Sequence, residues 1–178
     1  FTARIATAVG ADATLATWIL AASPLFFVLF HLAAADPFLA AAATGFHAAF
    51  LSRRRWLPFV ALGLGFLIKG PVFFVPTLLP LIAAAWWTRS WAELRPLRNL
   101  LGWLIVLVLG LTWYVYIVLR VPGLASYLLG SELWQRFAST KHHRGGPPYY
   151  FVVLLLIGTL PWTWAVIKGL VARVRARA

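Results

Sequence analysis

Lys69 is a lysine with a chemically unusual setting. It follows the apolar run Gly63–Ile68 and directly precedes Gly70 and Pro71. An ammonium at membrane depth is costly in lipid and persists mainly where it lines a wet cavity or meets an anion. The alternative is a side chain that extends along the apolar surface until its ammonium reaches water. Lys69 is therefore a candidate to bind an anion such as a phosphate.

A second set of candidates lies in the long polar stretch from Arg120 to Pro148 and just after it. Arginine offers a planar fork that suits phosphate oxygens, lysine offers a point charge and tyrosine a hydroxyl donor, so the set predicts a site for a lipid phosphate or pyrophosphate. The alternative is a solvated basic loop with an aromatic belt. The candidates for phosphate binding are Arg144, Tyr149 and Tyr150, and those for lining the site are Glu132 and Arg136.

Histidines and one aspartate complete the candidates. His142 and His143 could hold a divalent metal with an acidic partner, although adjacent histidines point apart and no regular ligand spacing is present. For His31 and His47, satisfied polar packing is favoured over catalysis. Asp36 precedes Pro37 at the start of an apolar segment, which favours a helix N-cap first and a place in the active site second.

The composition determines which elements can position these residues. The 178 residues are 62% hydrophobic and 11% charged, with a mean hydropathy of +0.86, which exceeds the roughly half-apolar norm of soluble domains. A lipid bilayer leaves unpaired backbone groups without partners, so the pattern predicts an all-α fold, a polytopic transmembrane helix bundle. The absence of cysteine excludes a disulfide framework and a thiolate metal site.

Apolar runs and their breakers predict one transmembrane domain over residues 1–178 with about six spans. The chain starts at Phe1 and contains no methionine, so we expect it to be a fragment that lacks an N-terminal part. No signal peptide pattern is present. The expected elements are a stub at 1–9, helices near 11–33, 37–52, 56–69, 71–87, 99–119 and 149–171, and a loop at about 120–148.

The segment from Trp56 to Trp87 is predicted to form a short hairpin. If its two basic ends share one side of the membrane, each half has only about fifteen residues, fewer than the roughly 20 that a span needs. Proline at positions 71, 76 and 80 argues against one continuous helix. The turn at Lys69 is therefore expected below the outer membrane surface.

The bias of lysine and arginine toward cytoplasmic loops predicts the orientation. The loop at about 120–148 then faces outward. The net charge of +12 indicates contact with anionic lipid headgroups rather than with nucleic acid. The predicted cytoplasmic cations are Arg4, Arg53, Arg54, Arg55, Arg89, Arg95, Arg98, Lys168, Arg173, Arg175 and Arg177, and the outer ones are Lys69, Arg120, Arg136, Lys141 and Arg144.

The order of several short motifs resembles bacterial GT-C glycosyltransferases. The resemblance extends from about Ser23 to Trp162. Within that family the chain is similar to the aminoarabinose transferase and to the family 39 enzymes related to dolichyl-phosphate-mannose–protein mannosyltransferase. The motifs are Ser23-Pro24-Leu-Phe-Phe, Asp36 opening a helix, Gly63-Leu-Gly-Phe-Leu-Ile-Lys69-Gly70-Pro71, Glu132-Leu-Trp-Gln-Arg136 and His143-Arg144-Gly145 through Tyr149-Tyr150-Phe151.

This resemblance implies an inverting transfer of a sugar from a polyprenyl-phosphate donor to a lipid or protein glycan acceptor, at the periplasmic face of the bacterial inner membrane. It also implies that Lys69 and Arg144 contact the donor phosphate, with Tyr149 or Tyr150 as a further contact. The catalytic carboxylate of such enzymes lies in a first outward loop, expected upstream of Phe1, so Glu132 is not assigned that role. His142 or His143 could contribute to a metal found in some relatives.

Two other classes of function stay open at this point. A transporter or flippase could use Lys69 to bind an anionic lipid-linked substrate, and inverted repeats would favour it, but none is visible in these residues. A membrane scaffold could use the polar loop to contact a partner. The donor sugar, the acceptor, the polyprenyl length and the oligomeric state are not legible in the sequence.

Overall fold

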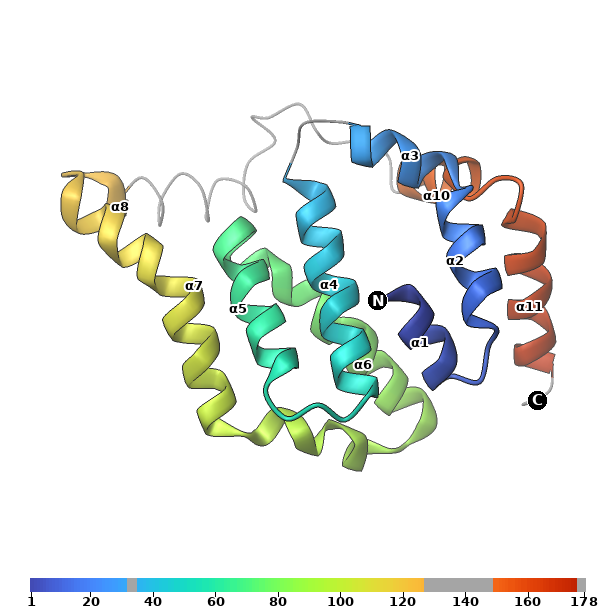
Figure 1. Ribbon diagram of the computed structural model, residues 1–178, viewed down its shortest axis with the longest axis horizontal. Coiled ribbons are helices and arrows are strands. Elements are labelled where there is room, and N and C mark those ends of the chain that lie inside the picture. The colour runs from blue at the N-terminus through green and yellow to red at the C-terminus, as the bar shows by residue number, and fades with distance from the viewer. Residues whose placement is uncertain (32–34, 127–148, 176–178) are drawn as a thin grey trace.

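The computed structural model describes residues 1–31, 35–126 and 149–175, and these residues form helices joined by turns (Figure 1). The all-α prediction is therefore confirmed for the described part of the chain. The elements are α1 (Thr2–Ala8), α2 (Ala13–Ala21), α3 (Pro24–His31), α4 (Asp36–Leu51), α5 (Leu57–Lys69), the 3-10 helix η1 (Gly70–Phe73), α6 (Phe74–Thr88), the 3-10 helix η2 (Trp91–Arg98), α7 (Leu100–Arg120), α8 (Leu124–Ser126), α10 (Tyr149–Gly158) and α11 (Thr163–Arg175).

The number of spans is smaller than predicted. Within the described residues, two helical segments are long and apolar enough to cross a membrane, Leu57–Thr88 and Leu100–Arg120, and the count rises to at most four if each of two bent helix pairs is one span. The predicted six exceeds this count because α4, with 16 residues, is shorter than a span needs, and because the predicted helices near 56–69 and 71–87 both lie within Leu57–Thr88. Segments of this length and hydropathy are consistent with an integral membrane protein.

Proline divides two of the predicted long helices. The run near 11–33 forms α2 and α3, whose axes differ by 61°, and the run near 149–171 is divided into two parts whose axes differ by 114°. Pro24 begins α3 and Pro161 lies between α10 and α11. A proline has no N–H to donate and its ring clashes with the preceding turn, which favours a bend or a break in a helix at that position.

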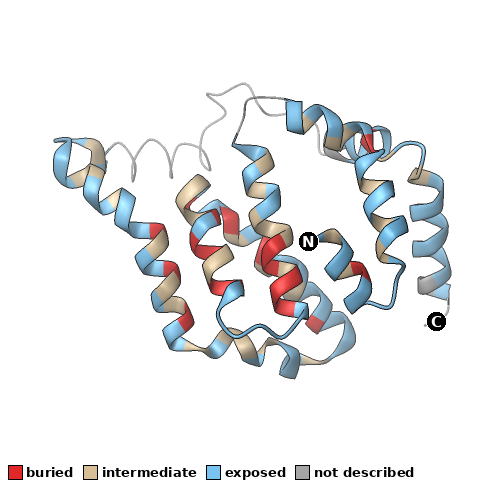
Figure 2. Cartoon of the chain, viewed as in Figure 1, coloured by how far each residue is buried: buried red, intermediate tan, exposed pale blue. Residues whose placement is uncertain are grey.

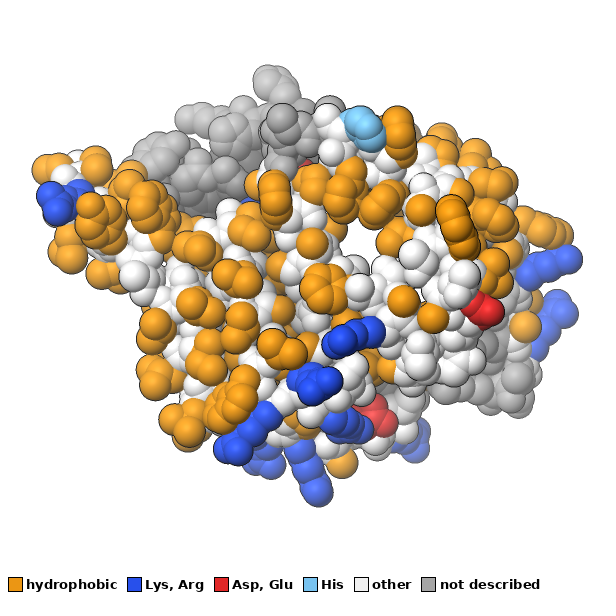
Figure 3. All heavy atoms as spheres, viewed as in Figure 1, with side chains coloured by type: hydrophobic (Ala, Val, Ile, Leu, Met, Phe, Trp, Pro, Cys, Tyr) orange, Lys and Arg blue, Asp and Glu red, His pale blue; other side chains and the backbone are white. Residues whose placement is uncertain are grey.

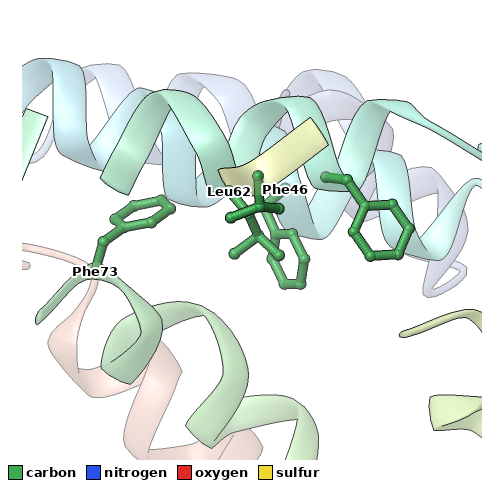
Figure 4. Close-up of a cluster of buried hydrophobic side chains, with 5 residues drawn as sticks. Phe46, Leu62 and Phe73 are labelled. Carbon is green, nitrogen blue, oxygen red and sulfur yellow. The ribbon is translucent and has the colours of Figure 1, made fainter. Parts of the chain in front are cut away.

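The core lies between α4, α5, η1 and α7. Phe46, Phe59, Leu62, Phe73 and Val106 form one buried cluster, and Figure 4 shows Phe46, Leu62 and Phe73 reaching into the same space between the helices. Figure 2 shows the buried positions of these helices facing one another, with few on α2 and α11. The tightly packed part of the protein is therefore the part that positions Lys69.

Helices α5 and α7 run parallel in close contact. Their contacts advance together: the ring of Phe59 fills the space beside Gly102, Gly63 lies against Leu109, and Gly110 lies against Phe66. A side chain at these glycines would overlap the facing residue, with a Cβ at Gly63 only 2.9 Å from Leu109 Cβ. Small residues at such contacts let helices approach closely, as is common in membrane bundles.

The chain folds back after α5, as the hairpin prediction requires. Gly70 has φ +70° and ψ −156°, which ends the helix, and the ring of Phe73 packs against Gly65. In a straight helix residues eight apart are separated by about 12 Å, so this contact needs a reversal. Figure 1 shows α6 running back toward the end of the bundle where α5 begins.

Arginines mark that end of the bundle. The set that we term the basic edge comprises three residues between α4 and α5, one after α6 and two in η2. Figure 3 shows Lys and Arg side chains gathered there, while hydrophobic side chains cover much of the visible face. The residues of the basic edge are Arg53, Arg54, Arg55, Arg89, Arg95 and Arg98.

Candidate functional site

Lys69 and Asp36 form an ion pair at the end of the bundle opposite the basic edge. The ammonium Nζ of Lys69 donates to the carboxylate Oδ1 of Asp36, although the residues are 33 positions apart. The Lys69 side chain is 40% exposed and that of Asp36 is 49% exposed. The pair is thus accessible from outside the packed core, and within the described residues it is the one ion pair closer than 4 Å.

Helix α4 brings Asp36 to the ion pair, and its position in the helix differs from the predicted N-cap. Ala35 occupies the N-cap position, no side chain caps the helix, and Asp36 lies in the first turn beside Pro37. The predicted N-cap role of Asp36 is therefore wrong. A carboxylate in the first turn still faces the positive end of the helix dipole, but its direct partner is the ammonium of Lys69.

The local sequence explains why Lys69 terminates α5. Gly70 adopts a positive φ that other residues rarely take, and Pro71 follows it as the second residue of η1. The N–H of Gly70 donates to the carbonyl of Phe66 and closes the last turn. Lys69 therefore lies at a fixed corner between α5 and η1 rather than along a continuous helix.

Tyr114 of α7 reaches the same corner, and sequence reasoning missed it. Its hydroxyl lies 3.5 Å from the carbonyl oxygens of Phe66 and Leu67, and its ring meets that of Phe66 edge-on with centroids 5.9 Å apart. The available signal was a tyrosine within the strongly apolar helix α7. A phenolic hydroxyl in such surroundings needs a hydrogen-bond partner.

The remaining predicted residues are not gathered at this corner by the described part of the chain. Tyr149 and Tyr150 begin α10, with exposed side chains, and α10 packs against α3. Five predicted residues lie outside the described residues: Glu132, Arg136, His142, His143 and Arg144. The predictions for those five stay predictions.

The two described histidines make backbone contacts, as favoured from sequence. His31 Nδ1 lies 2.8 Å from the carbonyl oxygen of Phe27 in the preceding turn. His47 Nε2 lies 3.3 Å from the carbonyl oxygen of Pro76 and so links α4 to α6. Residues 1–31, 35–126 and 149–175 contain no group of three or more histidine, cysteine, aspartate or glutamate side chains able to hold a metal ion.

Surface hollows in the described part lie away from the ion pair. One of about 400 Å³ runs along α7 between Leu107 and Tyr116, and one of about 220 Å³ is lined by Trp86, Trp87 and Arg89. The first is apolar and open, as expected of a surface against lipid chains. Neither of these two hollows is lined by Lys69 or Asp36.

The ion pair can exchange its partner. A half-exposed ion pair contributes only about 0–1 kcal/mol, whereas a phosphate monoester offers up to two negative charges and three acceptor oxygens. An anion of this kind can therefore compete with the single carboxylate for the ammonium of Lys69.

Comparison with known proteins adds no family assignment. No protein-family model matches the chain, and neither a curated protein nor a solved structure matches it.

Proposed function

We propose that this chain is part of a membrane glycosyltransferase that moves a sugar from a polyprenyl-phosphate donor to a lipid or protein glycan acceptor. The observation that carries the proposal is the ammonium of Lys69, which ends an apolar helix, is partly exposed and pairs with the carboxylate of Asp36. The order of motifs that resembles bacterial GT-C glycosyltransferases supports the same assignment.

The chemistry of transfer explains why a cation is needed there. The acceptor oxygen attacks the anomeric carbon, the bond from that carbon to the phosphate oxygen breaks, and the acceptor proton passes to a base. Negative charge builds on the departing phosphate in this step. A fixed ammonium in a low-dielectric environment stabilises that charge where it develops.

Asp36 has a defined part in this proposal. In the free protein its carboxylate neutralises Lys69, and the donor phosphate displaces it when the donor binds. An ammonium without any partner is costly at membrane depth, so the carboxylate supplies that partner and orients Lys69 until then. Asp36 thereby lines the active site as a competitor of the phosphate.

The remaining assignments follow the motifs. Arg144 supplies the second cation for the donor phosphate, Tyr149 or Tyr150 donates a hydroxyl to it, and Glu132 and Arg136 line the site. His142 and His143 contribute to a divalent metal if one is used. The site faces the periplasmic side of the bacterial inner membrane, and the basic edge contacts anionic headgroups on the cytoplasmic side.

The test uses the complete protein in lipid nanodiscs with a panel of polyprenyl-phosphate sugars. Release of the polyprenyl phosphate together with glycosylated acceptor supports the proposal. Substituting Lys69→Ala and Arg144→Ala together should abolish release while membrane insertion stays intact. Unchanged release in the double variant contradicts the donor site, and translocation of the donor without transfer indicates a transporter instead.

A further inference from the structure

The hydroxyl of Tyr114 lies where two helices run side by side. The parallel contacts of α5 and α7 continue from Phe59 beside Gly102 and Phe66 beside Gly110 to the end of α5. There the hydroxyl lies 3.5 Å from the carbonyl oxygens of Phe66 and Leu67. A Cβ at Gly70 would lie 3.6 Å from it, so it also borders the turn itself.

The carbonyl of Leu67 has a specific need for such a donor. In a continuing helix it would accept from the N–H four residues later, which here belongs to Pro71 and does not exist. The last carbonyls of a helix require partners from elsewhere. In apolar surroundings an unpaired carbonyl is unfavourable, and the hydroxyl of Tyr114 lies within reach of it.

We infer that Tyr114 is a positioning residue for Lys69. By holding the last turn of α5 against α7, its hydroxyl fixes the corner from which the ammonium of Lys69 reaches the carboxylate of Asp36. Loss of the hydroxyl frees the turn, and the ion pair is then held less often. The effect of Tyr114 on donor binding rests on the proposed function, whereas its effect on the ion pair does not.

The first experiment measures the ion pair directly. The complete protein, as wild type or as Tyr114→Phe, reacts with an amine-acylating reagent, and the modification rate at Lys69 is followed by peptide mass spectrometry. An amine held against a carboxylate is less accessible to the reagent and reacts slowly. Tyr114→Phe should raise the rate about threefold, the factor that one hydrogen bond within a membrane protein corresponds to, and Asp36→Asn should raise it at least as much.

Tyr116→Phe is the matched control. Tyr116 lies two residues further along α7, is exposed, and its ring packs beneath the guanidinium of Arg120 at 5.4 Å. Its hydroxyl has no part in the inferred positioning of α5, so the acylation rate at Lys69 in Tyr116→Phe should equal that of the wild type. Equal rates in wild type, Tyr114→Phe and Tyr116→Phe, with a raised rate in Asp36→Asn, overturn the inference.

The second experiment tests whether the Tyr114 hydroxyl affects donor binding through Lys69. Binding of an unsubstituted polyprenyl phosphate is measured for Tyr114→Phe, Lys69→Ala and the double variant. Tyr114→Phe should weaken binding about threefold alone, because a freed turn no longer holds the ammonium at the site, and this loss outweighs the weaker competition from Asp36. It should have no further effect on the Lys69→Ala background, because it acts through that residue. An equal loss on both backgrounds indicates a merely structural role and overturns the inference.

The two experiments separate the two ideas. If Lys69→Ala leaves binding of the polyprenyl phosphate unchanged, the proposed function fails. A raised acylation rate in Tyr114→Phe then still supports the positioning role.

Discussion

The two ends of the helix bundle carry positive charge in different ways. At the basic edge six arginines lie in the connections between α4 and α5 and between α6 and α7, and no ion pair within the described residues reaches them. Arg55 instead lies over the ring of Trp56 at 4.5 Å. At the other end Lys69 has a carboxylate partner from another helix. Helix α5, with its 13 residues, separates the two ends by about 20 Å.

The two sets of cations differ in where their partners come from. Arginines near lipid headgroups find anions in the membrane and need no partner from the protein. Lys69 is instead held by long-range contacts that local sequence rules do not require. We therefore expect substitutions at the two ends to differ in their effect on activity.

Lys69→Ala should have the largest effect on activity. We expect transfer from a polyprenyl-phosphate donor to fall about 10²-fold, as when one preorganised donor to a developing anion is removed. Release of polyprenyl phosphate by the complete protein measures this. Arg54→Ala, which removes a cation from the basic edge, serves as the control and should keep its activity. An equal loss of activity in both variants would contradict a functional difference between the two ends.

Gly65→Ala should have the largest effect on stability. The new methyl group would overlap the ring of Phe73, which is fully buried in the core, and overpacking of this kind costs about 1–3 kcal/mol. The thermal midpoint in detergent should fall accordingly. Gly169→Ala is the matched control, since nothing lies within 4 Å of a Cβ at that helical position, and its midpoint should not fall.

Asp36→Asn should strengthen the binding of a polyprenyl phosphate. The carboxylate competes for Lys69, and a half-exposed ion pair is worth about 0–1 kcal/mol, so affinity should rise by up to about fivefold. Titration of the complete protein in nanodiscs measures the dissociation constant. Weaker binding would mean that Asp36 orients Lys69 more than it competes with the phosphate.

Arg55→Ala should have the smallest effect. It removes a guanidinium that lies over Trp56 at the basic edge, far from the ion pair. Transfer activity should stay within about twofold of the wild type, because exposed charges at the far end of the bundle are screened. A loss close to that of Lys69→Ala would show that the basic edge takes part in catalysis.

Some elements were predictable because their causes are local. The boundaries of α4, α5 and α7 lie close to the predicted ranges 37–52, 56–69 and 99–119, since apolar runs and breakers determine them. The break at Gly70 and Pro71 was predicted for the same reason. Local reasoning failed at Asp36, where a typical N-cap residue next to proline pairs with Lys69 instead.

Local sequence accounts for the helical, strongly apolar character of the described residues, for the corner after Lys69 and for the arginines near the helix ends. These depend on backbone hydrogen bonding, on proline and glycine geometry and on composition. The packing of the helices, by contrast, brings Asp36 to Lys69 and brings Tyr114 to the end of α5, 48 residues from Phe66. Both contacts depend on how α4 and α7 pack against α5. Between α5 and α7 that packing follows from side chains meeting glycines across helices, which spacing along one helix does not encode.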